Sequence, residues 1–260
     1  MAPDKPISRY DRQIVFPPLG PAGQRRLGRA RVLIVGVGGL GCMSAELLTR
    51  AGVGFLRLVD DDLVRIENVH RQVLFDEADA AAARPKALAA AARLARINGE
   101  PQLQPIVARF TAGNAAELAE GVDLILDGSD NFETRFIIND LAVRDGKPWI
   151  MAGVVGAEAQ LMAVLPGRTP CLRCVMPTPP PVCADMSCRA AGVLPPAVTA
   201  IASLQAVEAL KILAGAMDAV SPYLLKLDMW SNTIQRIDLR AAAAGDCPCC
   251  KKRDFEYLPA

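Results

Sequence analysis

Four glycines follow a β-branched run near the start of the chain, in the segment VLIVGVGGLG at positions 32–41. Gly36, Gly38 and Gly41 fit the pattern G-x-G-x-x-G, with Gly39 inside it. Between a strand and a helix, such a turn brings backbone amides close to phosphate oxygens, and the helix dipole favours their negative charge. The turn therefore predicts a nucleotide site, with a merely tight strand-to-helix turn as the alternative. It does not separate ATP from NAD or FAD.

Polar and cationic side chains beyond this turn favour a triphosphate. Asp60 ends the next predicted strand, where a carboxylate accepts hydrogen bonds from ribose hydroxyls of either ATP or NAD. Asn68, Arg71 and Lys86 follow, and cations of this kind neutralise a pyrophosphate as it leaves. For each charged residue taken singly, an ordinary solvated surface charge is the alternative.

Two further carboxylates lie at and just after the end of another predicted strand. They are Asp127 and Asp130. Because ligands bind at the carboxyl ends of strands in a doubly wound sheet, Asp60, Asp127 and Asp130 are expected to line one crevice. A carboxylate there would hold the Mg²⁺ that accompanies a triphosphate.

Residues for hydride chemistry are scarce. The single histidine is His70, and none of Tyr10, Tyr223 and Tyr257 has a lysine four positions later. The phosphate-loop pattern G-x-x-x-x-G-K-[ST] is absent as well. The sequence thus favours ATP over NAD, in a site unlike that of a P-loop ATPase.

Paired cysteines form a second chemical group. Cys171 and Cys174 make one C-x-x-C pair, and Cys247 and Cys250 make another. Four thiolates at this spacing match a closed tetrahedral zinc site, which would staple the C-terminal tail to the body of the protein. A redox pair or buried thiols are the alternatives. Cys249 competes for the last position, and the C-x-x-C spacing selects Cys250.

The elements that position these residues follow an alternating pattern. Strands are predicted at 32–35, 55–59, 104–108, 122–126 and 148–151, and helices at 40–50, 76–97, 114–120 and 133–144. Alternation of this kind indicates parallel strands with crossover helices. Later strands at 159–165, 223–229 and 233–239 are expected to be antiparallel, with an irregular loop at 175–188 and a helix at 199–214.

The predicted fold class is therefore α/β, a Rossmann-like doubly wound sheet extended by antiparallel strands. We expect one domain over residues 1–260. It comprises an N-terminal arm with helices (1–30), a nucleotide-binding half (31–155), and a second half (156–260) that carries the antiparallel strands, a crossover loop at 175–190 and the zinc site.

Composition limits the partners. A formal net charge of +1 gives no reason to expect a nucleic-acid or membrane surface. The polar start MAPDKPISRYDRQ lacks the features of a secretory signal, which predicts a cytoplasmic protein. Residues 190–207 carry one charge-free stretch, mostly alanine and too weakly apolar for a membrane span. Eight cysteines without an export signal favour metal binding or chemistry over disulfides.

Several motifs in order along the chain resemble the ThiF/MoeB/HesA family, relatives of the ubiquitin-activating enzymes. They are Arg9-Tyr-Asp-Arg-Gln13, the glycine turn, Asn68-Val-His-Arg-Gln72, Pro85-Lys86, Asp127-Gly-Ser-Asp-Asn131 and the paired cysteines. The resemblance implies ATP-dependent adenylation of the C-terminal glycine of a small ubiquitin-like sulfur carrier of the MoaD or ThiS type, ending in Gly-Gly. It also implies a homodimer that serves molybdenum cofactor, thiamine or related biosynthesis.

The resemblance assigns roles to individual residues by matching position. Nucleotide contacts are expected from Gly36, Gly38, Gly39, Gly41, Asp60, Asp62, Gln72, Asp127 and Asn131, phosphate contacts from Asn68, Arg71 and Lys86, and Mg²⁺ binding from Asp130. Arg12 would reach into the site of the neighbouring subunit. Cys188 matches a crossover-loop cysteine that takes part in a covalent step in some relatives, with Cys183 or an incidental thiol as alternatives. An NAD(P)-dependent oxidoreductase and a non-catalytic scaffold are the competing functions.

Overall fold

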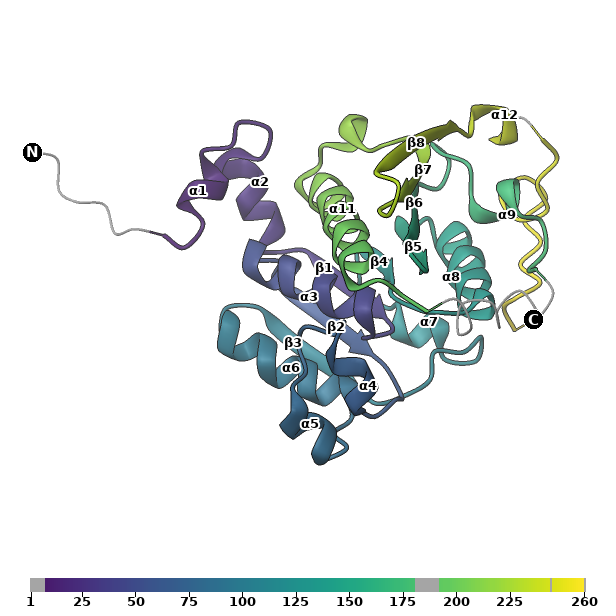
Figure 1. Cartoon of the computed structure of the whole chain (residues 1–260). Helices are drawn as coiled ribbons and strands as arrows, with labels where there is room; N and C mark the ends of the chain where they lie inside the picture. Colours follow the sequence, from purple (N-terminus) through teal and green to yellow (C-terminus); the bar gives the residue numbers. More distant parts are fainter. Residues whose placement is uncertain (1–7, 181–191, 244, 260) are drawn as a thin grey trace, which may run out of the picture.

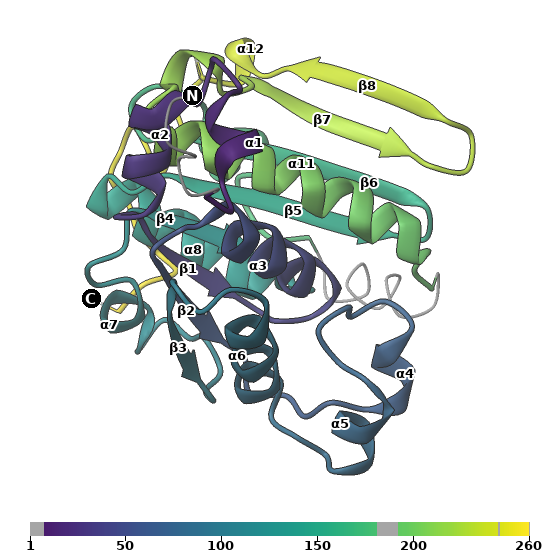
Figure 2. The same cartoon turned by 90° about the vertical axis from the view of Figure 1, so that its left-hand side faces the viewer.

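A single mixed sheet of eight strands organises the protein (Figures 1 and 2). The computed structural model describes residues 8–180, 192–243 and 245–259. The strand order is β3-β2-β1-β4-β5-β6-β7-β8. The strands are β1 (Arg31–Val35), β2 (Phe55–Val59), β3 (Gln102–Ile106), β4 (Leu124–Asp127), β5 (Trp149–Val155), β6 (Glu158–Val164), β7 (Tyr223–Asp228) and β8 (Thr233–Asp238).

The first five strands are parallel and the last three are joined antiparallel, as the sequence predicted. The parallel strands β1 and β4 are nearly continuous apolar runs because both of their faces are buried. The chain order reverses between β1 and β4, since β2 and β3 lie on one side of β1 and β4 lies on the other. This is the switch point at which doubly wound sheets bind ligands.

Helices cover both faces of the sheet. One face packs against α3 (Gly39–Ala51), α6 (Lys86–Ile97) and α11 (Pro195–Ala214), and the other packs against α7 (Ala115–Leu118) and α8 (Phe132–Asp145). By length and composition α11 could cross a membrane, but 61% of its most apolar window is buried inside the protein. It is the helix that covers β5 and β6 in Figure 2.

One predicted helix is broken in two. The sequence pattern predicted a helix over 76–97, whereas the chain forms α5 (Glu77–Ala81), a turn, and α6. Ala83 has a φ of +46°, which ends α5, and Pro85 precedes the first residue of α6, where a proline cannot continue an existing helix. The break matters because it places Lys86 at a helix start rather than inside a helix.

Other boundaries move by a few residues. β3 begins and ends two residues earlier than predicted, α11 begins at Pro195 rather than at 199, and β5 continues to Val155. Of the predicted irregular loop, residues 176–180 contain no helix or strand, and the remainder lies outside the described residues. Short elements complete the fold: α1 (Asp11–Ile14), α2 (Gly20–Leu27), α4 (Ile66–Val69), α9 (Leu172–Val175), η1 (Met217–Ala219) and α12 (Arg240–Ala243).

Candidate functional site

A cavity of about 1160 Å³ opens at the carboxyl ends of β1 and β2. The sequence-predicted residues that line it are Gly36, Gly38, Gly39, Asp60, Asp62, Asn68, Arg71, Gln72, Lys86, Asp130 and Asn131. These residues come from separate segments of the first half of the chain. The switch point of the sheet brings them together, as expected for a doubly wound fold.

The glycine turn forms the floor of this cavity. Gly36 has a φ of +85°, a conformation that side chains rarely adopt, and it lets the chain turn from β1 into α3. A Cβ on Gly41 would lie 1.9 Å from the carbonyl oxygen of Gly36, so the helix packs on the turn only because Gly41 has no side chain. Gly41 itself does not line the cavity. The N-terminus of α3 thus presents free backbone amides to the cavity.

Asp60 holds the turn in place. One of its carboxylate oxygens accepts a hydrogen bond from the amide of Val37 at 2.7 Å, and the other accepts one from the amide of Asp62 at 2.8 Å. Burial raises the pKa of the Asp60 carboxyl above its ordinary value, and these amide donors oppose that shift. A carboxylate has about four acceptor positions, so Asp60 keeps capacity for a ligand hydroxyl.

Lys86 and Arg71 supply positive charge on the opposite wall. Lys86 is nearly buried, and its Nζ lies 2.8 Å from Oδ2 of the exposed Asp62. Arg71 donates from Nη1 to the carbonyl of Glu67 at 2.8 Å, and the same atom lies 2.8 Å from Nε2 of His70. Both cations therefore face the cavity from well-defined positions.

Asn68 and Gln72 lie beside them and are both buried. Oδ1 of Asn68 accepts the amide of Arg65 at 3.0 Å and so caps the short helix α4. Oε1 of Gln72 is a buried polar atom without a hydrogen-bond partner among the described residues. Because such an atom is costly unless paired, Gln72 is well suited to meet a ligand donor.

The two carboxylates after β4 differ sharply in environment. Asp130 is exposed at the cavity, and no cationic side chain of the described residues lies within ion-pair distance of it. Asp127 is fully buried, paired with Arg135 at 2.9 Å, and does not line the cavity. The expectation that Asp127 faces the crevice is therefore wrong, because Arg135 and Ser129 occupy its acceptor atoms.

Asn131 keeps a structural task as well as its place in the cavity wall. Its Oδ1 accepts a hydrogen bond from the backbone amide of Thr134 at 2.9 Å and so caps α8.

Arg12 is exposed on α1 and does not line the cavity of this chain. Cys183 and Cys188 lie outside the described residues.

Several cavity residues were missed by sequence reasoning. Arg135, His70 and Arg109 line the wall, and so do Gln160 and Lys226 on the antiparallel strands. Arg135 stands beside the apolar residues Phe136, Ile137 and Ile138 of α8, which was a weak sequence signal for a buried cation. No comparable signal marked Gln160 or Lys226, because only strand register brings them to the cavity.

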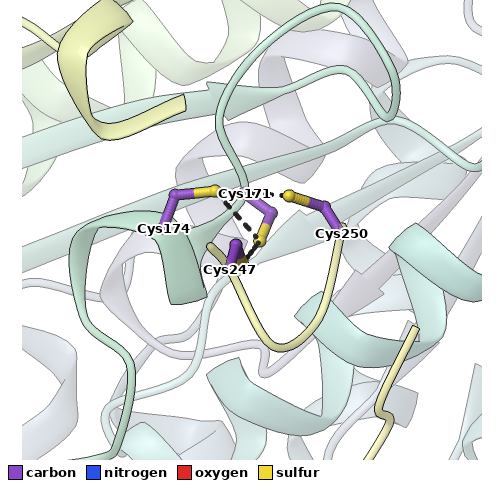
Figure 3. Close-up of side chains that lie close together, drawn as sticks. All are labelled: Cys171, Cys174, Cys247 and Cys250. Carbon is purple, nitrogen blue, oxygen red and sulfur yellow. Dashed lines mark hydrogen bonds between the residues drawn. The ribbon is translucent and has the colours of Figure 1, made fainter. Parts of the chain in front are cut away.

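The four predicted cysteines meet in space (Figure 3). Sγ of Cys171 lies 3.8 Å from that of Cys174 and 3.6 Å from that of Cys247, and the Cys174 and Cys250 sulfurs are 3.3 Å apart. A tetrahedral zinc with Zn–S bonds of about 2.3 Å places its sulfurs about 3.8 Å apart. The cluster therefore has the size and donor set of a structural metal site.

Hydrogen bonding between Cys171 and Cys174 lowers the pKa of the Cys171 thiol and raises the pKa of the Cys174 thiol. Cys249 is buried beside Cys171, and its sulfur accepts a hydrogen bond from Nδ2 of Asn139 at 3.4 Å. It is not one of the four cysteines whose sulfurs all lie within 4.8 Å of one another. The geometry agrees with the C-x-x-C spacing in selecting Cys250. Of the cysteines that the structure describes, Cys42 is also buried; burial raises the pKa of its thiol, which makes it unsuited to reactivity.

Arg173, between the first two cysteines, ties this cluster to the rest of the protein. It is almost fully buried and pairs with Asp140 of α8 at 3.2 Å and with Glu256 near the C-terminus at 3.1 Å. It also donates to the carbonyl of Asp254 at 3.0 Å. The cysteine cluster and the C-terminal segment are thus anchored on the same helix.

Solved structures with the same arrangement include several of E. coli MccB. A structure of E. coli MccB with MccA-N7isoASN superposes with a TM-score of 0.81 at 22% identity and covers 96% of this chain and 76% of that chain. A structure of E. coli MccB with ATP gives a TM-score of 0.78 at 23% identity, covering 94% of this chain and 73% of that chain. At these identities the likeness establishes the fold.

Sequence relatives are considerably more similar. The sulfur carrier protein ThiS adenylyltransferase of Bacillus subtilis is 42% identical over 252 residues, 96% of this chain and 73% of that protein. The sulfur carrier protein adenylyltransferase of Thermus thermophilus is 39% identical over 94% of this chain and 90% of that protein. The adenylyltransferase and sulfurtransferase MOCS3 of Sus scrofa is 43% identical, and this chain spans 54% of its length.

The ThiF family model matches residues 10–249, from the tyrosine after Arg9 to the cysteine before Cys250. This range includes the glycine turn, the cations of the cavity and three of the four clustered cysteines. Together with the relatives that match almost the whole chain, it establishes the family. The chain belongs to the ThiF family.

Proposed function

We propose that this protein is an ATP-dependent adenylyltransferase that activates the C-terminal glycine carboxylate of a small ubiquitin-like sulfur carrier ending in Gly-Gly. The observation that carries the proposal is the convergence of Arg71, Lys86 and Asp130 on the cavity at the N-terminus of α3. Two cations and a free carboxylate suit a magnesium-bound triphosphate, whereas a nicotinamide dinucleotide needs fewer charges. The family and the names of the relatives agree with this assignment.

The proposed reaction needs no general base from the cavity. A C-terminal carboxylate has a pKa of about 3.5 and is ionised at neutral pH, so it attacks without a general base. One carboxylate oxygen bonds to the α-phosphorus, the bond from that phosphorus to the β-phosphate oxygen breaks, and pyrophosphate leaves with its electron pair. The products are the acyl adenylate and pyrophosphate, and catalysis consists of positioning and charge stabilisation.

Each part of the nucleotide has matching residues. The free amides of α3 and the glycine turn would bind phosphate, Asp60 the ribose hydroxyls, and Asn68, Arg71 and Lys86 the triphosphate. When bound, Mg²⁺ neutralises phosphate charge, and the exposed carboxylate of Asp130 is the residue we assign to hold it.

The test is ATP–pyrophosphate exchange by the purified protein with ThiS-type and MoaD-type carriers ending in Gly-Gly. Carrier-dependent exchange is expected from the wild type. Lys86→Met should lower the rate about 100-fold, the usual effect of removing one preorganised charge donor. Arg50→Met is the matched control, because Arg50 is an exposed cation on α3 that pairs with Glu46 of the same helix.

Two results would contradict the proposal. NAD binding without exchange for any carrier would support an oxidoreductase, and neither binding nor exchange would support a scaffold. Carrier preference in the same assay also separates molybdenum cofactor from thiamine biosynthesis.

Three further assignments belong to this proposal. The cysteine cluster is assigned to Zn²⁺, because four thiolates in a closed set are typical of structural zinc. The active form is assigned as a homodimer of single-domain chains in the cytoplasm, with Arg12 completing the site of the partner. A covalent step at Cys188 or Cys183 stays a prediction from the sequence.

A further inference from the structure

The cavity continues past the nucleotide half onto the antiparallel strands. Sites for drug-sized ligands have volumes of about 300–1,000 Å³, so 1160 Å³ leaves room for a second group beside the nucleotide. Gly153 on β5, Gln160 on β6 and Lys226 on β7 all line this extension. They stand in one row across the sheet, because Gly153 pairs with Gln160 and Gln160 pairs with Lys226.

Lys226 differs from most cations of the cavity in lacking a carboxylate partner. Three others are paired with acids: Lys86 with Asp62, Arg135 with Asp127, and Arg109 with Glu133. Among the described residues, Lys226 and Arg71 have no carboxylate within 4.0 Å. Arg71 lies in the half assigned to the triphosphate. Lys226 is therefore the cation that can contact a ligand in the antiparallel half of the cavity.

The acids nearest to Lys226 along the strands are Glu158 and Asp228, and neither forms an ion pair with it. Glu158 lines the same cavity and stands opposite Asp228 in the strand register. Asp228 accepts hydrogen bonds from Trp230 and Ser231 in the turn between β7 and β8. Among the described residues, the half-buried Lys226 therefore forms no ion pair with an acid of the strands beside it, although Glu158 lines the same cavity.

The row across the sheet also fixes the separation between Gly153 and Lys226. Neighbouring strands lie about 4.8 Å apart, so Lys226 is about 10 Å across the sheet from Gly153. Gly153 adjoins the nucleotide half, since a Cβ there would lie 3.2 Å from Nη2 of Arg135. An extended peptide advances about 3.3 Å per residue, so one that ends near Gly153 would place its fourth residue from the end near Lys226.

We propose that Lys226 is a specificity-determining residue that contacts an acidic side chain at the fourth position from the C-terminus of the carrier. The inference rests on the proposed function, because it takes the carrier tail as the occupant of the antiparallel half. A cation at this point favours carriers with Asp or Glu there and disfavours those with Lys or Arg, by direct charge complementarity.

The experiment uses the full-length protein and one ThiS-type carrier prepared with Glu, Ala or Lys at the fourth position from its end. Exchange is measured as a function of carrier and of ATP concentration. For the wild type, KM should be lowest for the Glu carrier. Lys226→Met should raise KM for the Glu carrier about tenfold, the value of one charge-assisted hydrogen bond, with kcat and the KM for ATP unchanged. Lys226→Glu should reverse the preference toward the Lys carrier.

Arg236→Met is the matched control. Arg236 lies on the adjacent strand β8 opposite Leu225, so its side chain emerges on the other face of the sheet. This variant should keep the wild-type order of carriers.

The outcomes separate the two proposals. Absence of exchange by the wild type with every carrier would overturn the proposed function. Exchange with equal KM for the three carriers, or an equal rise in KM for all three in Lys226→Met, would overturn the role of Lys226 while leaving adenylation intact. Reversal by Lys226→Glu supports it, because a merely structural lysine does not change which tail is preferred.

Discussion

At the scale of single residues, this site depends on which charges are paired and which are free. The nearly buried Lys86 is held by Asp62, while Asp130 stays exposed at the same cavity. Asp127, three positions before Asp130, is instead a buried partner of Arg135. The two carboxylates thus differ in role although they are close in sequence: Asp130 is open to a ligand, and Asp127 belongs to the core.

The buried Asp127 carboxyl should leave a signature in the pH dependence of stability. Burial raises its pKa, and Arg135 only partly opposes this effect. The folded state therefore holds the proton more tightly than the unfolded state. The contribution of this carboxyl to the free energy of unfolding is complete below the ordinary Asp pKa of about 4 and is lost as pH rises through the raised value.

Asp127→Asn should remove this component from the pH dependence. The difference in free energy of unfolding between variant and wild type should change with pH by about 1.4 kcal/mol for each unit by which the pKa is raised. Urea denaturation at a series of pH values measures it. Asp218→Asn, at a carboxylate 97% exposed, should leave the dependence unaltered, and an identical slope for both variants would contradict the prediction.

At the scale of elements, the site is made by a strand, a glycine turn and a helix that fit closely. Gly36 turns the chain, and Gly41 lets α3 approach the turn. The same fit places the amides of α3 where phosphate binds. The β4–α8 connection then adds Asp130 beside them.

Gly41→Ala should disrupt this fit. A Cβ there would lie 1.9 Å from backbone oxygen, so α3 must move. We expect a loss of about 1–3 kcal/mol in the free energy of unfolding, as for other overpacked cores, together with weaker ATP binding. Gly99→Ala is the control, because no atom lies within 4 Å of the added methyl group. Equal stability of the two variants in urea denaturation would refute the expectation.

The cysteine cluster belongs to the same scale, since it brings the first turn of α9 together with the C-terminal segment. Cys250→Ser should reduce bound zinc from about one ion per chain to a small fraction of it, because structural sites need all four thiolates. Cys249→Ser should keep the ion, since the sulfur of Cys249 is not one of the four that all lie within 4.8 Å of one another. Metal content by mass spectrometry of the purified variants distinguishes them, and the opposite result would assign Cys249 as the ligand.

At the scale of the whole molecule, the proposed dimer would complete the site. Arg12 is exposed on α1 and does not line the cavity of its own chain, which fits a role in the partner's site. Arg12→Ala and Lys86→Met should each be nearly inactive, with Lys86→Met at about 1% of the wild-type rate. Mixing equal amounts with subunit exchange should restore about a quarter of wild-type activity, because half of the dimers are mixed and each has one intact site.

Sedimentation and the mixing assay together check this prediction. A monomer active in exchange would exclude a shared site. A dimer whose mixed variants regain no activity would place Arg12 outside the partner's site.

Much of the fold followed from periodicity. The buried parallel strands, the helix after the glycine turn and the hairpin around Ser231 and Asn232 carry strong local patterns, and the structure has them within a few residues. The helix predicted over 76–97 was wrong because an alanine-rich run conceals a turn. Helix propensity does not reveal the positive φ of Ala83 that separates α5 from α6.

The sequence by itself determined the chemistry available to this protein: the glycine turn, the cations, the free acid and the paired cysteines are fixed by residue type and short spacing. Only the tertiary structure decided which of them meet. Asp127 turns to Arg135, and Lys226 reaches the cavity through strand register. Contacts between separate elements depend on how the layers pack and how the strands align. Local sequence patterns do not encode this packing and register.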